Sequence, residues 1–136
     1  MSRPYFLPHT TYSDFRGELL SINFEEAPFP PNRVYFISSL NTSGVPRVSH
    51  AHKKLSQIVF ALSSVWEVEL YFGTKKSTFE IQPMGSPLFI PERYWRNAVC
   101  KNENGLLGVI ASQTYDEADY IRNYEDYLDW INSGAD

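Results

Sequence analysis

Residues 44–62 read GVPRVSHAHKKLSQIVFAL, so two histidines that stand two positions apart lead into a run of apolar and β-branched residues. Side chains alternate between the two faces of a strand, so His50 and His52 are expected to point to the same side. The run at 57–62 has the length and composition of a strand. This stretch predicts a β protein in which one strand carries a pair of converging imidazoles.

Similar runs of β-branched and aromatic residues recur through the middle of the chain. They lie at 33–37, 65–72, 77–81, 88–90 and 106–111, with turn residues between them. Within the second of these, Glu67 and Glu69 alternate with Val68 and Leu70, which is the pattern of a half-buried strand. Many short strands of this kind favour an all-β sandwich, jelly roll or barrel.

The pattern changes near the end of the chain. From 115 to 131 the apolar residues recur at spacings of one, three and four: Tyr120, Ile121, Tyr124, Tyr127, Leu128 and Ile131. These spacings are helical. We therefore expect one short C-terminal helix on an otherwise all-β body.

Composition narrows the class of protein. A chain of 136 residues with 43% hydrophobic and 21% charged residues is expected to form a single domain spanning 1–136. No apolar run approaches a membrane span and no signal peptide is visible, and one cysteine allows no internal disulfide, so the cytoplasm is the expected compartment. A net charge of -4 argues against nucleic acid as a partner.

The spacing G-x5-H-x-H-x4-Q from Gly44 to Gln57 resembles the first signature of the cupin superfamily, a jelly-roll fold, in which a glutamate usually stands at the place of Gln57. Residues 85–96 resemble the second signature, but Arg96 stands where a ligand histidine would be. Two imidazoles beside a guanidinium make a poor metal site, so we expect no metal. Free imidazoles titrate at about 6.5 and suit proton transfer near neutral pH. The alternative for the histidine pair is a solvated or hydrogen-bonded pair on a surface strand.

A narrower resemblance rests on several blocks taken together. They are 33–37, Pro46-Arg47 with HAHKK at 50–54 and Gln57, Trp95, and YDEADYIRNY at 115–124. In this combination the chain resembles, from about residue 14 to 131, the sugar 3,4-ketoisomerases that act on dTDP-4-keto-6-deoxyglucose, metal-free cupins of the WxcM-like group. The resemblance implies a homodimer with a dTDP-linked sugar as substrate, no metal and no other cofactor, and no nucleic acid or membrane as partner.

The resemblance also implies roles for the residues. The ketone would move from C4 to C3 through an enediol, with His52 as the base at C3 and His50 as the partner that moves protons at the oxygens, or with these two roles exchanged. Tyr35 is a candidate hydrogen-bond donor to the sugar, or else a core tyrosine. Gln57 can donate and accept at once, which suits an oxygen that changes from carbonyl to enol.

The diphosphate of such a substrate needs cations, and the forked guanidinium of arginine fits phosphate oxygens. The candidates are Arg16, Arg33, Arg47 and Arg96. For each arginine alone, a surface ion pair is at least as strong an alternative as a contact with the substrate, although at least one arginine should bind the anion. The base could stack on Trp95 or on Tyr94.

The C4 configuration of the product depends on which acid returns the proton. Arg96 is a very poor proton donor, so we expect protonation from the histidine side and a product of gluco configuration. Two other functions stay open at this point: a non-catalytic cupin that binds a sugar nucleotide or carbohydrate, and a metal-dependent cupin oxygenase or isomerase.

Overall fold

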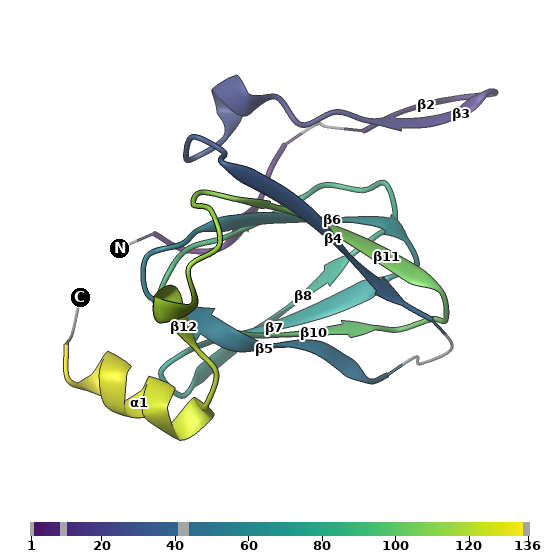
Figure 1. Cartoon of the computed structure of the whole chain (residues 1–136). Helices are drawn as coiled ribbons and strands as arrows, with labels where there is room; N and C mark the ends of the chain where they lie inside the picture. Colours follow the sequence, from purple (N-terminus) through teal and green to yellow (C-terminus); the bar gives the residue numbers. More distant parts are fainter. Residues whose placement is uncertain (1, 9–10, 41–43, 135–136) are drawn as a thin grey trace.

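The computed structural model describes residues 2–8, 11–40 and 44–134. Two five-stranded antiparallel sheets face each other (Figure 1). The first sheet has the order β1 (Tyr5–Phe6), β9 (Leu88–Ile90), β6 (Gln57–Ser63), β11 (Gly105–Ala111) and β4 (Arg33–Ser39). The second has the order β12 (Tyr120–Ile121), β5 (Pro46–His52), β10 (Trp95–Cys100), β7 (Trp66–Phe72) and β8 (Lys75–Ile81).

The remaining elements lie outside the two sheets. The strands β2 (Thr11–Asp14) and β3 (Gly17–Leu20) form a hairpin that extends away from the body (Figure 1). Two 3-10 helices span Phe24–Glu26 and Glu117–Asp119, and the one α-helix of the described chain is α1 (Tyr124–Asn132). None of the helices in the described residues is long and apolar enough to cross a bilayer. The predicted all-β sandwich with a short C-terminal helix is confirmed.

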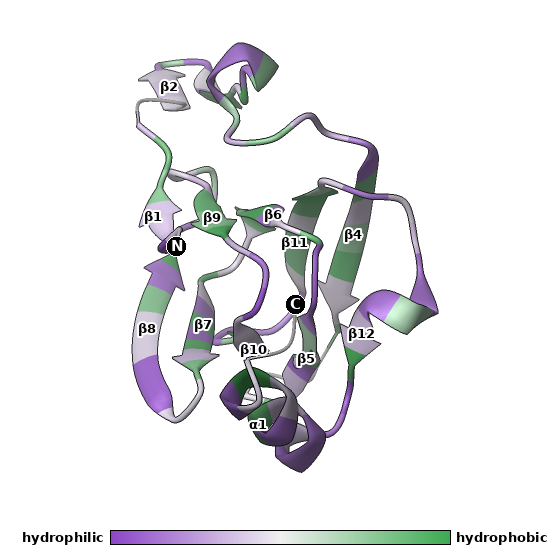
Figure 2. Ribbon diagram, turned by 90° about the vertical axis from the view of Figure 1, so that its left-hand side faces the viewer, coloured by the Kyte–Doolittle hydropathy of each residue, from purple (hydrophilic) through white to green (hydrophobic). Residues whose placement is uncertain are grey.

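The space between the sheets is apolar over most of its length and polar at one end. Buried apolar residues from both sheets fill the apolar part: Val59, Ala61, Trp66, Val68, Leu70, Leu88 and Leu107. The interior strand β11 is accordingly mostly hydrophobic, whereas the edge strand β8 carries a long hydrophilic stretch (Figure 2). At the polar end, the first residues of β6 and β10 and the last of β5 bring Gln57, Arg96 and His52 into the interior.

The outer face of each sheet is also partly covered. Ile58, Phe60 and Ile110 on the first sheet pack against the segment that follows the β2–β3 hairpin. Trp95 and Ala51 on the second sheet pack against α1. These outer layers leave the polar end of the sandwich as the place where functional side chains gather.

The periodicity from 115 to 131 describes two different elements. The helix begins only at Tyr124, where the side chain of Asn123 accepts a hydrogen bond from the backbone N–H of Asp126. Tyr120 and Ile121 form the short strand β12, which pairs with β5 at His52 and Ala51. The expectation that helical structure begins near residue 115 is therefore wrong, because a capped 3-10 turn and a strand pairing replace the first helical turns.

Candidate active site

The two histidines of β5 meet inside the sandwich. Their Nε2 atoms lie 3.0 Å apart, and both rings are buried. Alternation along β5 places both side chains on the inner face, as the sequence predicted. The ring of Tyr120 contacts both imidazoles, with centroid distances of 5.0 Å to His50 and 4.4 Å to His52.

Burial decides the charge of this pair. Loss of hydration, and then the nearby Arg96 guanidinium, lower the pKa of His50 from its usual 6.5 to about 3. The same two causes lower the pKa of His52. Both rings are therefore neutral at pH 7, and the expectation that they titrate near 6.5 does not hold in the folded protein.

A chain of hydrogen bonds lies beside the histidines. Arg96, the cross-strand partner of His50, donates from Nη1 to Gln57 Oε1 at 2.6 Å and from Nη2 to the carbonyl of Tyr94 at 3.1 Å. Gln57 in turn donates from Nε2 to Tyr35 Oη at 2.9 Å. Gln57 thus donates and accepts at once. Because Tyr35 is the acceptor in this contact, its own hydroxyl proton is not used by Gln57.

Arg96 is a buried cation among neutral partners. Its side chain is fully buried, its Nε has no hydrogen-bond partner among the described atoms, and burial lowers its pKa from 12.5 to about 10. It is still protonated at neutral pH. Burial also raises the pKa of the Tyr35 phenol, so this hydroxyl stays protonated as well.

The guanidinium groups of two more arginines lie over aromatic rings next to the histidine pair. The guanidinium of Arg33 lies 4.4 Å from the ring centroid of Tyr35 and 5.4 Å from that of Tyr115. Its Nη1 is buried and has no hydrogen-bond partner among the described residues. Arg122 lies 4.3 Å from the centroid of Tyr120 and pairs with Glu117 at 2.8 Å.

Three of the candidate residues lie elsewhere in this chain. Arg16 is on the β2–β3 hairpin, where its 76% exposed side chain pairs with Asp14. Arg47 is exposed at the shift in register between β5 and β10 and lies outside the histidine cluster. Trp95 is on the outer face of β10, buried among Ala51, Ile121 and Tyr127 under α1. The structure brings together His50, His52, Tyr35, Gln57, Arg96 and Arg33.

The structure also adds a residue that the sequence did not single out. Asp119, at the end of the second 3-10 helix, places Oδ2 at 3.1 Å from His52 Nδ1. The sequence spacing predicted a helix from residue 115, and a helix there gives no reason to place Asp119 beside the end of β5. The 3-10 turn and the pairing of β12 with β5 place it there. The signal available was the group of charged and aromatic residues at 115–122.

Donor chemistry at the site does not favour a metal ion. Among the described residues, no group of three or more histidine, cysteine, aspartate and glutamate side chains is arranged to hold one. Beyond the Asp119 carboxylate, which already contacts His52 Nδ1 at 3.1 Å, the polar groups of the cluster are an amide, a phenol and a guanidinium cation. Such groups are poor partners for a divalent ion.

Comparison with known proteins places the fold and the site in context. The model of the family FdtA, described as WxcM-like, C-terminal, matches residues 5–132. The chain is 33% identical over 120 residues to a TDP-4-oxo-6-deoxy-alpha-D-glucose-3,4-oxoisomerase from Aneurinibacillus thermoaerophilus, covering 87% of this chain and 85% of that protein.

Solved structures agree with this match. The sugar 3,4-ketoisomerase QdtA from Thermoanaerobacterium thermosaccharolyticum, in complex with TDP, superposes with a TM-score of 0.87 at 30% identity, over 96% of each chain. The WlaRB TDP-quinovose 3,4-ketoisomerase from Campylobacter jejuni gives a TM-score of 0.82 at 32% identity, over 95% of this chain and 99% of that one.

Proposed function

This chain belongs to the FdtA family of WxcM-like proteins and is an isomerase, and from this premise we propose that it converts dTDP-4-keto-6-deoxyglucose into dTDP-3-keto-6-deoxyglucose. The observation that carries the proposal is the buried contact of 3.0 Å between the Nε2 atoms of His50 and His52, beside the chain from Arg96 through Gln57 to Tyr35. Neutral imidazoles can take up and return protons in a site that excludes water.

In the proposed reaction only protons and one double bond move. His52 takes the proton from C3, the C–H electron pair forms the double bond between C3 and C4, and the C4 oxygen receives a proton. The C3 hydroxyl then gives up its proton while C4 receives one, which leaves the ketone at C3. His50, in contact with His52, moves the protons at the two oxygens.

The enediol intermediate carries partial negative charge on oxygen, and the site holds donors for it. Arg96 supplies a buried cation, and Tyr35 supplies a phenol proton that its contact with Gln57 does not use, because Gln57 is the donor there. The buried, unpartnered Nη1 of Arg33 is the group that we assign to the diphosphate, because a guanidinium binds phosphate oxygens in pairs. We also propose that two copies pair and that the protein works in the cytoplasm.

The test uses solvent deuterium. The protein is incubated with dTDP-4-keto-6-deoxyglucose in deuterium oxide containing a chelator, and the sugar is analysed by NMR and mass spectrometry. Deuterium in the ring and a new 3-keto sugar are expected. Binding of the nucleotide sugar without exchange would instead mean a binding protein, and activity lost in the chelator and regained with added metal would mean a metal-dependent cupin.

The configuration at C4 is tested on the same product. Protonation from the histidine side is expected to give the gluco sugar, because Arg96 remains a cation and donates no proton at neutral pH. The product is trapped by reduction, and the coupling between H4 and H5 is measured. A large diaxial coupling supports gluco, whereas a small one means galacto and another acid at C4.

A further inference from the structure

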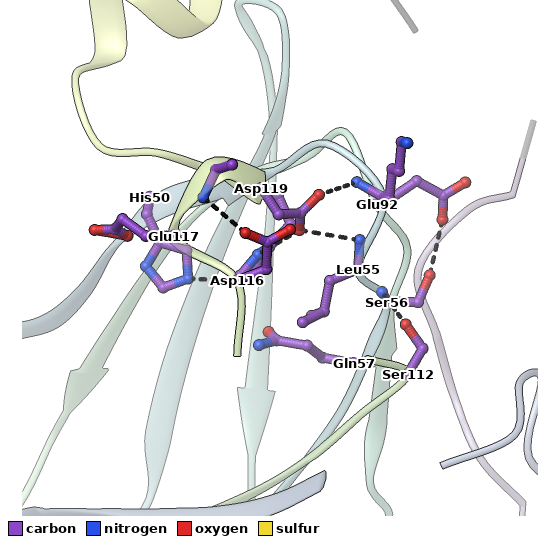
Figure 3. Close-up of polar contacts among 12 residues, drawn as sticks. His50, Leu55, Ser56, Gln57, Glu92, Ser112, Asp116, Glu117 and Asp119 are labelled. Carbon is purple, nitrogen blue, oxygen red and sulfur yellow. Dashed lines mark hydrogen bonds and ion pairs between the residues drawn. The ribbon is translucent and has the colours of Figure 1, made fainter. Parts of the chain in front are cut away.

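The carboxylate of Asp119 is held by the backbone of the loop after β5. Its Oδ1 accepts from the N–H of Lys54 at 2.8 Å, and its Oδ2 accepts from the N–H of Leu55 at 3.3 Å (Figure 3). The backbone carbonyl of Asp119 accepts from the N–H of Lys53 at 3.0 Å. With 6% of its surface exposed, this side chain is fixed in place and turned toward His52.

These contacts set the proton positions on both histidines. A carboxylate accepts hydrogen bonds and donates none, so the proton of neutral His52 is on Nδ1, facing Asp119. The Nε2 of His52 then carries a lone pair. Since the 3.0 Å contact between the two Nε2 atoms needs one donor, His50 donates from its own Nε2.

We propose that Asp119 is a positioning residue that acts through His52, selecting the tautomer in which Nε2 carries the lone pair that a base needs; in this structure that lone pair accepts from His50. The role rests on the proposed function, in which His52 is the base at C3. When His52 takes the C3 proton it becomes a cation, and the Asp119 carboxylate at 3.1 Å stabilises that cation in a site of low polarity. The same contact assigns the base, since His50 has no carboxylate partner among the described residues.

The decisive variant is Asp119→Asn, which keeps the shape and removes the charge. An amide accepts on one side only, and its oxygen is expected to keep the shorter bond, from the N–H of Lys54 at 2.8 Å rather than from that of Leu55 at 3.3 Å. Its NH2 group then faces Nδ1 of His52 and favours the tautomer with the proton on Nε2. The turnover number for isomerisation is expected to fall by about two to four powers of ten, with the affinity for dTDP little changed. Asp116→Asn is the matched control, because this exposed carboxylate caps the same 3-10 helix through the N–H of Ala118 and should leave turnover unchanged.

The tautomer is read directly from the 15N chemical shifts of histidine side chains, assigned by comparison with His52→Asn. In the wild-type protein, the Nδ1 of His52 should carry the proton, and in Asp119→Asn the Nε2 should carry it. A wild-type His52 protonated on Nε2 overturns the proposal even if the variant does not fold. Full turnover by a folded Asp119→Asn protein overturns it as well.

This readout separates the inference from the proposed function. If the wild-type protein shows no isomerisation while His52 carries its proton on Nδ1, the function fails and the structural contact stands. If isomerisation occurs and His52 is protonated on Nε2, the function stands and the role of Asp119 fails.

Discussion

At the scale of single residues, the guanidinium of Arg96 dominates the chemistry of the site. It is a fully buried cation whose hydrogen-bond acceptors, Gln57 and the carbonyl of Tyr94, are neutral. Its positive charge contributes to the lowered pKa of both histidines. The same charge would stabilise an enediolate, so the arginine favours neutral bases before the reaction and a negative oxygen during it.

The first residue-scale prediction concerns the base. His52→Asn should lower the turnover number by about two to four powers of ten, because the variant loses the proton acceptor and retains a similar shape. Affinity for dTDP, measured by titration calorimetry, should stay near the wild-type value. Ser49→Ala is the control, since Ser49 lies on the same strand and is exposed. Wild-type turnover by the His52→Asn protein would show that another group removes the C3 proton.

The second residue-scale prediction concerns acid stability. Both histidines have a lower pKa in the folded protein than in the unfolded chain, so the unfolded chain binds more protons below pH 6.5. The free energy of unfolding should therefore fall as the pH drops from 6.5 to 5, with a slope that approaches about 1.4 kcal/mol per pH unit for each buried neutral histidine. Urea unfolding at a series of pH values measures this slope.

The double variant His50→Asn with His52→Asn is the comparison for that slope. It should flatten the pH dependence in this window, because no imidazole is then left to bind protons in the cluster. An equally steep slope in the double variant would assign the acid sensitivity to other groups.

Strand alternation and motif spacing predict most of the residues that gather around His52, but they do not predict Asp119. His50 and His52 share a face through strand alternation, and the motif spacing brought Gln57 and Arg96 into consideration beside them. Asp119 reaches His52 across 67 positions of sequence, and no local pattern encodes that distance. The outward positions of Arg47 and Trp95 depend on register and on the cover of α1, which motif matching does not supply.

At the scale of elements, α1 supports the loop that leads to the site. The hydroxyl of Tyr127 lies 2.7 Å from the carbonyl of Arg93 and 2.9 Å from that of Tyr71, and it accepts from the N–H of Gly73 at 3.1 Å. Arg93 has a φ of 78°, in the left-handed region, and its N–H donates to the carbonyl of His52 at 2.8 Å. The helix therefore holds an unfavourable backbone conformation at Arg93, next to the end of β5 that carries the histidine pair.

We expect Tyr127→Phe to lower the free energy of unfolding by about 1–3 kcal/mol, because buried polar groups lose their partner. Urea unfolding measures the change. Tyr124→Phe is the matched comparison and should cost less, about 0.5–1.5 kcal/mol, since its hydroxyl makes one longer contact of 3.3 Å to the carbonyl of Gly73. Equal losses in the two variants would contradict the anchoring role of Tyr127.

The helix also shows how far a sequence pattern can be used at this scale. Tyr124, Tyr127, Leu128 and Ile131 pack on the second sheet as the helical spacing predicted. Tyr120 and Ile121 fitted the same spacing but pair with β5 as a strand. Two adjacent apolar residues fit a helical period as well as a strand. Only the tertiary pairing with β5 shows that these two form a strand.

At the scale of the whole molecule, several large apolar side chains are exposed on the surface of the single chain. Val34 and Phe36 on the edge strand β4 are 57% and 55% exposed. Exposed apolar residues also occur on and after the β2–β3 hairpin: Tyr12, Phe15, Leu19 and Phe24. Apolar surface beside an open sheet edge favours pairing between copies.

The protein is therefore expected to sediment with twice the 15.7 kDa mass of the chain. Phe36→Glu should shift the equilibrium toward a single chain, because it places a charge in the apolar contact. Thr78→Glu, on the exposed strand β8, adds the same charge elsewhere and should leave the mass unchanged. A single-chain mass for the wild-type protein at micromolar concentration would contradict the proposed dimer.

The contact between His52 and Asp119 has a further consequence for how the protein matures. It joins the end of β5 to a segment 67 residues later, so it cannot form during synthesis until the last strands have left the ribosome. Contacts of such long range are closed late, after local hairpins such as β7–β8 have formed. Refolding chains should thus regain sheet content before they regain activity.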